Sequence, residues 1–270
     1  MFLSVRKILT NPEAVFRTAH HYLYRQRPRS MIKILQIKIV GLLATGNILL
    51  AGCIDKYDDS IYVSQDGTTA YYPTLGTVED TEPITVASDT YGTLIPTNPE
   101  VFEKNRADSI GQRVFLNVVF SPDTDKSNSG KREVMVLNLY SVPTFTAIDL
   151  RKAGDTLPDT FGNDPVQITG ASISKEHLNI EFNFKGSGNT HTHGFSLLLT
   201  KDAQLDNQGI LPVELRHDAK SDTPTGWYWG VTSFTLKSIP EYQQGTFKGF
   251  SIKYNSGANS QAVWEVKKSS

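Results

Sequence analysis

The 270-residue sequence contains only one cysteine, Cys53, which excludes a disulfide bond within the chain. None is needed for folding, because 39% hydrophobic residues supply enough apolar surface for one large or two ordinary domains. A lone free thiol is nevertheless a liability in the oxidising compartments where secreted proteins reside. If the chain is exported, Cys53 therefore requires a chemical role of its own.

The N-terminal region lacks a hydrophobic run long enough to span a membrane. The apolar stretch at residues 39–50 is twelve residues long and includes Thr45 and Asn47, whereas a spanning helix requires about 20 residues. Basic residues at Lys33 and Lys38 precede the stretch, and small residues follow it. This arrangement is typical of a secretory signal peptide rather than a transmembrane helix.

The residues before the cysteine, Leu50, Ala51 and Gly52, complete a segment that resembles a bacterial lipobox. The resemblance implies that residues 31–52 are a lipoprotein signal peptide and that Cys53 is acylated and becomes the new N-terminus. Two or three acyl chains make membrane anchoring effectively permanent, because each buried methylene contributes about 0.8 kcal/mol. We therefore expect a cell-envelope protein anchored to the outer membrane, on its periplasmic or its surface face.

Two short segments flank this signal. Residues 1–30 are basic and precede Met31, which indicates either a misassigned start codon or an extended n-region of the signal. Residues 53–60 contain the lipidated cysteine and three aspartates. This acidic cluster is interpreted either as a solvated tether or as an export signal for the outer face of the outer membrane.

Net positive charge is missing from the part of the chain that follows the signal. Residues 1–53 carry a net charge of +7, residues 54–150 carry -8, and residues 151–270 are neutral. Nucleic-acid binding depends chiefly on Lys and Arg that neutralise phosphates, so an acidic first domain would repel a polyanion. The charge distribution therefore excludes DNA and RNA as expected partners.

Apolar and polar residues alternate with a period of two along most of the chain, and no sustained helical stripe is present. The clearest alternation runs from Leu178 to Phe184, where Leu, Ile and Phe alternate with Asn and Glu. A half-buried strand requires this pattern. One short helix is predicted after Asn98, because a polar cap followed by Pro99 is a start signal. Short strands separated by turn-forming clusters predict an all-β fold built from barrels or sandwiches.

Apolar residues become sparse between Leu150 and Pro165, where Gly, Pro, Asp and basic residues gather. Such a composition is typical of a loop or linker. We therefore predict a domain boundary there, with a first domain at residues 61–155 and a second at residues 156–270.

The order of several segments resembles the NigD-like lipoproteins. These segments are the lipobox, the acidic tether, the strand opening at residues 111–114, and the pair at residues 164–168 and 177–182. The resemblance implies an N-terminal OB-like β-barrel followed by a C-terminal β-sandwich. It carries over no catalytic residues and no established activity. The family's association with a bacteriocin gene cluster suggests a bacteriocin-associated or immunity-like role.

His191 and His193 flank one threonine in a glycine-rich stretch and are candidate metal ligands. In an extended segment both imidazoles would point to one side. Closed or catalytic zinc sites need three or four protein ligands, and the remaining candidates after the signal are His177, His217 and Asp218. The alternative, which we favour, is a solvated loop edge, so no metal or other cofactor is predicted.

Trp227, Tyr228 and Trp229 form the candidate ligand-binding site. In a strand both indoles would lie on one face. If exposed, they would provide a stacking surface for a sugar ring or for an apolar patch of a partner. If buried, they belong to the sandwich core, which is the interpretation we favour because strand aromatics ordinarily pack.

Aromatic residues of the first domain offer a second candidate surface. Ligands of OB barrels usually lie across the second and third strands and the neighbouring loops. Tyr71, Tyr72, Tyr91 and Phe102 fall where such a face would lie. Whether their side chains point outward is not determined by the sequence.

The sequence contains only a partial match to a known motif for nucleophilic catalysis. Ser172 and Lys175 have the Ser-x-x-Lys spacing of penicillin-recognising enzymes, but the partner motifs are missing and the stretch has a strand pattern. We therefore predict a non-enzymatic envelope protein that binds a protein, peptide or glycan. The alternatives are a carbohydrate-binding accessory lipoprotein and a metal-assisted hydrolase around the two histidines.

Overall fold

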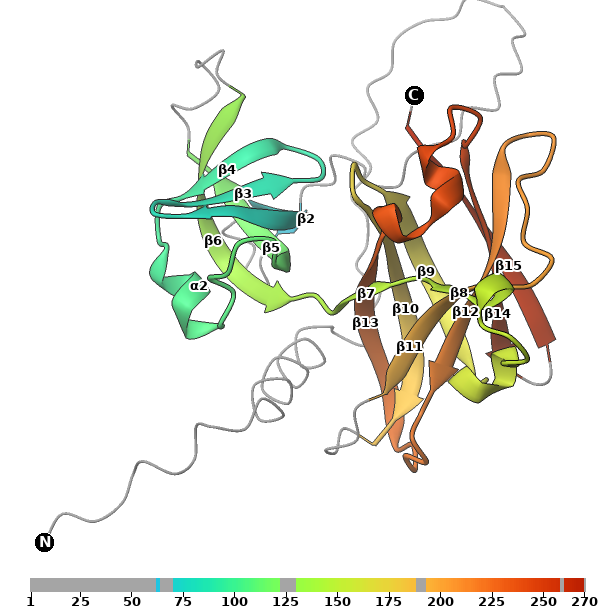
Figure 1. Ribbon diagram of the computed structural model, residues 1–270. Coiled ribbons are helices and arrows are strands. Elements are labelled where there is room, and N and C mark those ends of the chain that lie inside the picture. Colours follow the sequence, from blue (N-terminus) through green and yellow to red (C-terminus); the bar gives the residue numbers. More distant parts are fainter. Residues whose placement is uncertain (1–61, 64–69, 122–129, 188–192, 258–259, 270) are drawn as a thin grey trace, which may run out of the picture.

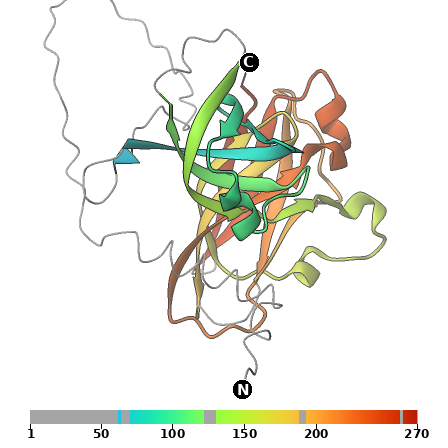
Figure 2. The ribbon, with the colours of Figure 1, turned by 90° about the vertical axis from the view of Figure 1, so that its left-hand side faces the viewer.

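The computed structural model describes residues 62–63, 70–121, 130–187, 193–257 and 260–269. These residues form almost only β-strands, together with one short α-helix and four short 3-10 helices. Figure 1 shows two β domains side by side, and Figure 2 shows the N-terminal domain in front of the strands of the other. The predicted all-β class, with a barrel followed by a sandwich, is confirmed.

The N-terminal domain is a closed five-stranded barrel. Its strands are β2 (Ala70–Thr81), β3 (Ile84–Ser88), β4 (Gly92–Pro96), β5 (Arg113–Phe120) and β6 (Lys131–Ser141). The strand order is β2-β3-β4-β6-β5, and β2 also pairs with β5, which closes the barrel. Only β4 and β6 are parallel within it. This is the Greek-key arrangement of an OB fold. The two-residue β1 (Tyr62–Val63) pairs with the start of β2.

The one α-helix of the described residues, α2 (Glu100–Lys104), begins directly after Pro99, as predicted. Phe102 from this helix is fully buried in the barrel core. The side chain of Asn98 both donates to and accepts from the β6 backbone at Val136, at 2.9 Å each. The segment that introduces the helix is therefore attached to the barrel by hydrogen bonds as well as by apolar packing.

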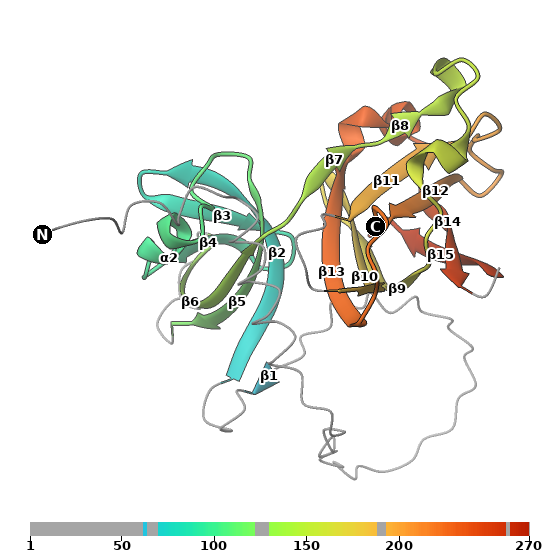
Figure 3. The ribbon, with the colours of Figure 1, turned by 90° about the horizontal axis from the view of Figure 1, so that it is seen from below.

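The C-terminal domain is a sandwich of two sheets, which Figure 3 shows from below. The first sheet has the order β7-β13-β10-β9 and the second has the order β15-β14-β12-β11-β8. The strands of the first sheet are β7 (Thr144–Thr146), β9 (Val166–Ile173), β10 (His177–Gly186) and β13 (Gly226–Thr235). The strands of the second are β8 (Ile148–Asp149), β11 (Gly194–Leu199), β12 (Ile210–Asp218), β14 (Gly249–Gly257) and β15 (Ser260–Lys267).

The inward side chains of the two sheets form one apolar core. Leu178, Ile180, Phe182 and Phe184 of β10 all point into it, as their alternation in the sequence predicted. Phe195 of β11 faces the aromatic pair of β10, with its ring 4.2 Å from that of Phe182. Two 3-10 helices, η4 (Leu236–Ser238) and η5 (Pro240–Gln243), follow β13 and contribute to the connection toward β14.

The polar segment between Leu150 and Pro165, which was predicted to separate the domains, packs on the sandwich. It contains η2 (Leu150–Lys152) and η3 (Pro158–Phe161). Arg216 on the outer side of β12 holds this segment through Asp159 at 3.0 Å and through the carbonyl of Gly162 at 3.3 Å. The strands just before it, β7 and β8, pair with β13 and β11. The sandwich therefore starts near β7, before the predicted boundary at residue 155.

The two domains share a buried polar junction. Arg113 on β5 is 1% exposed and pairs with Asp89 at 2.6 Å within the barrel. The same guanidinium donates to the Asn179 side chain of β10 at 2.8 Å, and Ser233 of β13 donates to that amide oxygen at 2.7 Å. The Asn179 amide nitrogen in turn donates to Asp89 at 3.0 Å. These hydrogen bonds fix the barrel against the outer side of the first sheet.

Candidate functional site

The candidate site lies on the first sheet of the sandwich, on the side that does not face the core. Strands β10 and β13 are antiparallel over ten residue pairs, from His177 opposite Thr235 to Gly186 opposite Gly226. The end with His177 lies at the domain junction. The other end continues into the connection to β11 and into residues 219–225, which lead into β13.

The three aromatic residues that open β13 alternate between the two sides of the sheet. Tyr228 packs against the core, with its ring 6.1 Å from that of Phe184. The interpretation as sandwich core therefore holds for Tyr228. Trp227 and Trp229 point to the opposite side, because successive side chains of a strand alternate. The sequence correctly placed both indoles on one face.

Trp229 is covered by the barrel. Its ring lies 5.5 Å from that of Phe115 on β5, at an angle of 62°. Edge-to-face contacts of this kind stabilise aromatic pairs. Its indole nitrogen is buried and has no hydrogen-bond partner among the described residues. Trp229 is thus a contact between the domains, which the sequence alone did not indicate.

Trp227 is 44% exposed, and the prediction that it belongs to the core is wrong. Lys185, its cross-strand partner on β10, holds its ammonium group 5.4 Å from the centre of the indole ring. These two side chains line a shallow hollow together with Pro224, Thr225 and Gly226. An exposed indole beside an open hollow is an available contact surface for a ligand.

The side-chain amides of two residues continue this surface across the sheet. The strand register places Asn183 of β10 beside Trp229 on one side and beside Gln167 of β9 on the other. Neither amide takes part in a hydrogen bond among the residues that the structure describes. We call the surface formed by Gln167, Asn183, Lys185, residues 224–226 and Trp227 the Trp227 face.

The loop that carries part of this face is held in place by Asp222. The Asp222 carboxylate accepts a hydrogen bond from the backbone N–H of Ser187 at 2.6 Å and lies 3.2 Å from His193 Nε2. The N–H of Thr225 also donates to the carbonyl of Gly186 at 2.7 Å. The position of the loop beside the end of β10 is therefore fixed by several hydrogen bonds.

Behind the loop, two imidazoles are stacked inside the sandwich. His193 Nδ1 lies 2.7 Å from His217 Nε2, and His217 Nδ1 lies 3.2 Å from the carbonyl oxygen of Pro165. The Pro165 carbonyl can only accept, so His217 presents an N–H from Nδ1 to it. His193 Nε2 likewise presents an N–H to the Asp222 carboxylate. The two rings therefore form one hydrogen-bonded chain from Pro165 to Asp222.

Burial determines the protonation of the neighbouring groups. It lowers the pKa of His217 to about 4, and the adjacent charge of His193 acts in the same direction. Burial alone would raise the pKa of Asp222, but hydrogen bonds from Ser187 and His193 outweigh it and hold this pKa at about 2. At neutral pH, Asp222 is therefore ionised and His217 is neutral.

The histidine pair of the sequence prediction is not assembled as a metal site in the described residues. His191 lies outside those residues, and both ring nitrogens of His193 are engaged by protein groups. The described part of the chain contains no cluster of three or more His, Cys, Asp or Glu side chains suited to a metal ion. His177 is buried separately at the domain junction, where burial and the Arg113 charge lower its pKa to about 4.

The aromatic residues proposed for the barrel surface contribute mainly to packing. Phe102 is fully buried, whereas Tyr72 and Tyr91 are partly buried against the barrel core. Their rings surround Phe120, with centroid distances of 5.0 Å and 5.1 Å. Tyr71 is half-buried near the start of β2. These residues do not form an open aromatic surface comparable to the Trp227 face.

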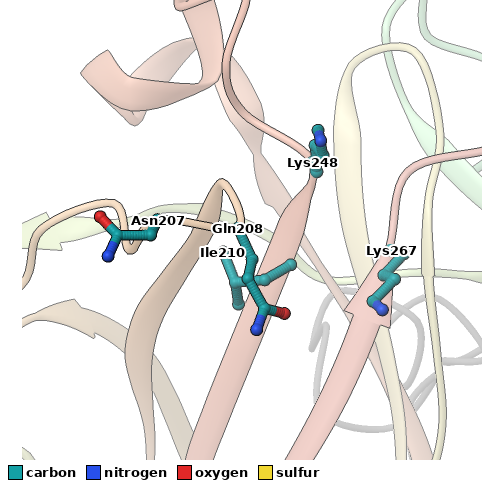
Figure 4. A pocket seen from close by; sticks show the side chains of 5 residues that line it. All are labelled: Asn207, Gln208, Ile210, Lys248 and Lys267. Carbon is teal, nitrogen blue, oxygen red and sulfur yellow. The ribbon is translucent and has the colours of Figure 1, made fainter.

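A second hollow lies at the opposite end of the sandwich, near the starts of β12 and β14 (Figure 4). Its walls are Asn207, Gln208, Ile210, Lys248 and Lys267. It has no aromatic side chain, and Figure 4 shows separate side chains that converge on no common point. We therefore take the Trp227 face as the candidate site.

The predicted signal peptide and Cys53 lie outside the described residues. Within the described ranges, none of the helices has the length and apolar character needed to cross a membrane. The anchoring prediction therefore rests on the sequence alone.

Comparison with known families gives one match to the described domains. The family profile of the "NigD-like C-terminal beta sandwich domain" matches residues 149–267. This range contains the whole Trp227 face. No match was found among curated proteins.

Several crystal structures share the fold of this chain at low sequence identity. A toxin-related protein, so described, from Parabacteroides distasonis is 22% identical, with a TM-score of 0.56, over 73% of this chain and 92% of that one. A protein from Bacteroides fragilis that is described as a lipoprotein is 14% identical, with a TM-score of 0.52, over 74% of this chain and 99% of that one. A NigD-like immunity protein from Bacteroides caccae is 18% identical, with a TM-score of 0.50, over 77% of this chain and 93% of that one. At these identities the similarity establishes the fold alone.

Proposed function

Because the chain belongs to the NigD-like family through its C-terminal β-sandwich, we propose that it is a lipid-anchored envelope protein that binds its ligand noncovalently at the Trp227 face. The lipid on Cys53 fixes the protein at the outer membrane, and the acidic residues that follow hold the barrel off the membrane surface. The sandwich then presents the Trp227 face to a ligand.

The exposure of Trp227 is the observation that carries this proposal. Large aromatic side chains are the residues that most often dominate binding energy, and they lose little conformational entropy on binding. The neighbouring Trp229 is packed on Phe115, so the sheet behind Trp227 is held rigid. Asp222 holds the adjoining loop in the same way. The Trp227 face is therefore preorganised, which lowers the entropic cost of binding.

The engaged imidazoles favour binding over hydrolysis. A general base needs a ring nitrogen within reach of a substrate proton. Both nitrogens of His193 and both of His217 already have protein partners. These residues therefore support the loop of the Trp227 face and are not placed to activate water.

The anchor is tested on the protein isolated from its own host. We expect mass spectrometry to show an N-terminal peptide that starts at Cys53 and carries acyl chains. The variant Cys53→Ala is expected to carry no acyl chains, to retain residues before position 53 and to be missing from the outer-membrane fraction. An unmodified, water-soluble protein with the native cysteine would remove the anchoring part of the proposal.

The binding face is tested by photo-crosslinking in living cells. A photoreactive phenylalanine derivative replaces Trp227 in the full chain, and the matched control replaces Val263, which is 59% exposed on β15. We expect a covalent adduct at position 227 in the envelope fraction and none at position 263. Equal adducts at the two positions, or none at either, contradict a ligand at the Trp227 face.

An immunity-like role is the form of binding that the family resemblance favours. In that case the ligand is a toxic peptide that the protein intercepts at the envelope. A basic peptide would be steered by the segment 54–150, whose net charge is -8. Electrostatic steering weakens at high salt, whereas simple steric blocking does not.

Charge reversal separates these two modes of protection. The double variant Glu79→Lys, Glu82→Lys reverses two exposed charges of the barrel. We expect it to protect cells less well against purified cationic bacteriocins. Their inhibitory concentration should then fall toward the value measured for cells without the protein. The matched control Lys237→Glu reverses an exposed charge of the sandwich instead of the barrel. Protection that is indifferent to both salt and charge reversal contradicts steering.

A further inference from the structure

We propose that the ligand of the Trp227 face is a glycan that contains hexuronate residues, with a sugar ring on Trp227 and its carboxylate on Lys185. This inference rests on the proposed binding function and names the chemical class of its ligand. Three observations support it: the exposed indole, an ammonium group above it that pairs with no carboxylate of the described residues, and two side-chain amides beside it that have no hydrogen-bond partner in the same part of the chain.

The indole provides the stacking surface. A pyranose ring has one face made mostly of C–H groups, and such a face packs on the negative face of an aromatic ring. Trp227 is exposed, while its neighbour Trp229 is covered by Phe115. One sugar ring can therefore stack at position 227, beside the hollow at residues 224–226.

Lys185 provides the charge. Its ammonium group lies 5.4 Å from the centre of the indole ring and has no carboxylate partner among the described residues. The one acidic residue of the segment 219–225, Asp222, has a side chain that is 5% exposed and is already engaged by Ser187 and His193. The positive charge beside the indole is therefore available to an anionic group of a ligand.

The position of this ammonium group favours an acidic sugar over a neutral one. A neutral ring that stacks on the indole must displace the ammonium group, which lowers affinity by a factor of about two to five at an exposed site. An acidic sugar draws the same group to its carboxylate and replaces the lost contact with an ion pair. The geometry therefore selects for negative charge next to the stacked ring, on the sandwich, whose residues 151–270 are neutral overall, and not on the acidic barrel.

The amide groups extend the face to the size of an oligosaccharide. The face runs across three neighbouring strands, from Gln167 on β9 through Asn183 and Lys185 on β10 to Trp227 on β13. Strands are spaced about 4.8 Å apart, so the face spans about 10 Å, the length of roughly two sugar rings. Amides both donate and accept hydrogen bonds, as sugar hydroxyls require. Asn183 and Gln167 have no other partners in the described residues.

Calorimetry on the full chain tests the proposal. The protein is purified from its host in a detergent without a sugar headgroup. The probes are tetragalacturonate and a hyaluronan tetrasaccharide, each beside its methyl ester, which keeps the shape and removes the charge. We expect at least one acid to bind at least fivefold more tightly than its ester. We also expect Lys185→Met to abolish this preference and Trp227→Ala to abolish binding of both forms.

A matched control and a separate readout keep the outcomes distinct. Lys237→Met removes an exposed lysine near the other end of β13 and is expected to change nothing. Three results would overturn the hexuronate assignment. They are equal binding of acid and ester, a preference for the acid that survives Lys185→Met, and no binding of either acid. If crosslinking at position 227 still yields a specific adduct, only the ligand class fails. If that adduct is missing as well, the proposed function fails.

Discussion

The guanidinium of Arg113 in the barrel donates a hydrogen bond to the side chain of Asn179 in the sandwich at 2.8 Å. The same Arg113 pairs with Asp89, and Asn179 donates back to that carboxylate. Arg113 and Asn179 are buried, and Asp89 lies at the edge of the junction with its side chain 17% exposed, so each group provides hydrogen-bond partners for the other two where little water reaches. A buried polar group without its partner carries a full desolvation penalty, so the three side chains favour one arrangement of the two domains.

Removal of Arg113 is expected to destabilise the protein strongly. The variant Arg113→Met leaves Asp89 and Asn179 without their cationic partner, and loss of one member of a buried pair costs about 3–5 kcal/mol. Urea denaturation followed by tryptophan fluorescence measures this change. The control Arg132→Met removes only a cation–π contact with Phe120 at 5.3 Å and should cost about 1 kcal/mol or less. Similar losses for both variants would contradict the junction.

The two indoles of β13 are expected to differ in their contribution to stability. Trp229→Ala removes the contact with Phe115 and opens the domain junction, which should cost about 2 kcal/mol or more. Trp227→Ala removes an exposed side chain and should change the free energy of unfolding by about 0.5 kcal/mol or less. Denaturation midpoints measure both values. The reverse order would show that Trp227 and not Trp229 is a packing residue.

The segment that joins η3 to the sandwich is expected to tolerate no side chain at Gly162. This residue has φ +80°, and an added Cβ would lie 2.6 Å from the backbone oxygen of His217. Gly162→Ala should therefore cost at least about 2 kcal/mol. Gly154 has a similar φ of +60° but no neighbouring atom within 4 Å, so Gly154→Ala should cost about 1 kcal/mol. Thermal unfolding of the two variants compares them, and equal losses would indicate that the segment is a free linker.

Mild acid is expected to destabilise the fold through its buried histidines. The pKa of His217 is about 4 in the folded protein and 6.5 when unfolded. The unfolded chain therefore binds a proton in this range that the folded chain rejects. Stability contributed by the neutral imidazole is present above pH 6.5 and is lost as the pH falls toward 4, on the order of 3 kcal/mol. His177 contributes with the same sign in the same range.

Urea titrations between pH 7.5 and 4.5 measure this dependence. His217→Gln removes the titrating group, so its stability should fall less steeply with acid than that of the native chain. His177→Gln isolates the other histidine in the same way. Protonation of Asp222 affects stability only at lower pH, because the pKa of this carboxylate is about 2 in the folded protein and 3.8 ordinarily. Parallel pH curves for the native chain and both variants would contradict the assigned protonation.

The sequence predicted the strands better than the surfaces. The alternation from Leu178 to Phe184 specified a strand with one buried side, because a period of two leaves no choice of face once the core is known. The pair Asn98 and Pro99 likewise located the only α-helix of the described residues. The polar segment at residues 150–165 was less informative, because Arg216 and Asp159 bind it to β12 through contacts remote in sequence.

The candidate site was predictable only in part. Trp227, Tyr228 and Trp229 follow each other in the chain, and the period of two separated Tyr228 from the two indoles. No local pattern distinguishes the indole that meets Phe115 from the one that faces solvent, because this depends on how the domains dock. The partnership of His193 with His217 and Asp222 was also beyond the sequence, since these residues come from three separate segments.

Fluorine NMR of the full chain labelled with 5-fluorotryptophan tests most directly whether the ligand contacts residue 227. The chain has three tryptophans, at positions 227, 229 and 264, and single Trp→Phe variants assign the three signals. On addition of tetragalacturonate or the hyaluronan tetrasaccharide, we predict a saturable shift of the Trp227 signal while those of Trp229 and Trp264 stay in place. A Trp227 signal that remains unchanged at saturating concentrations of both probes, or equal shifts of all three signals, would contradict the account.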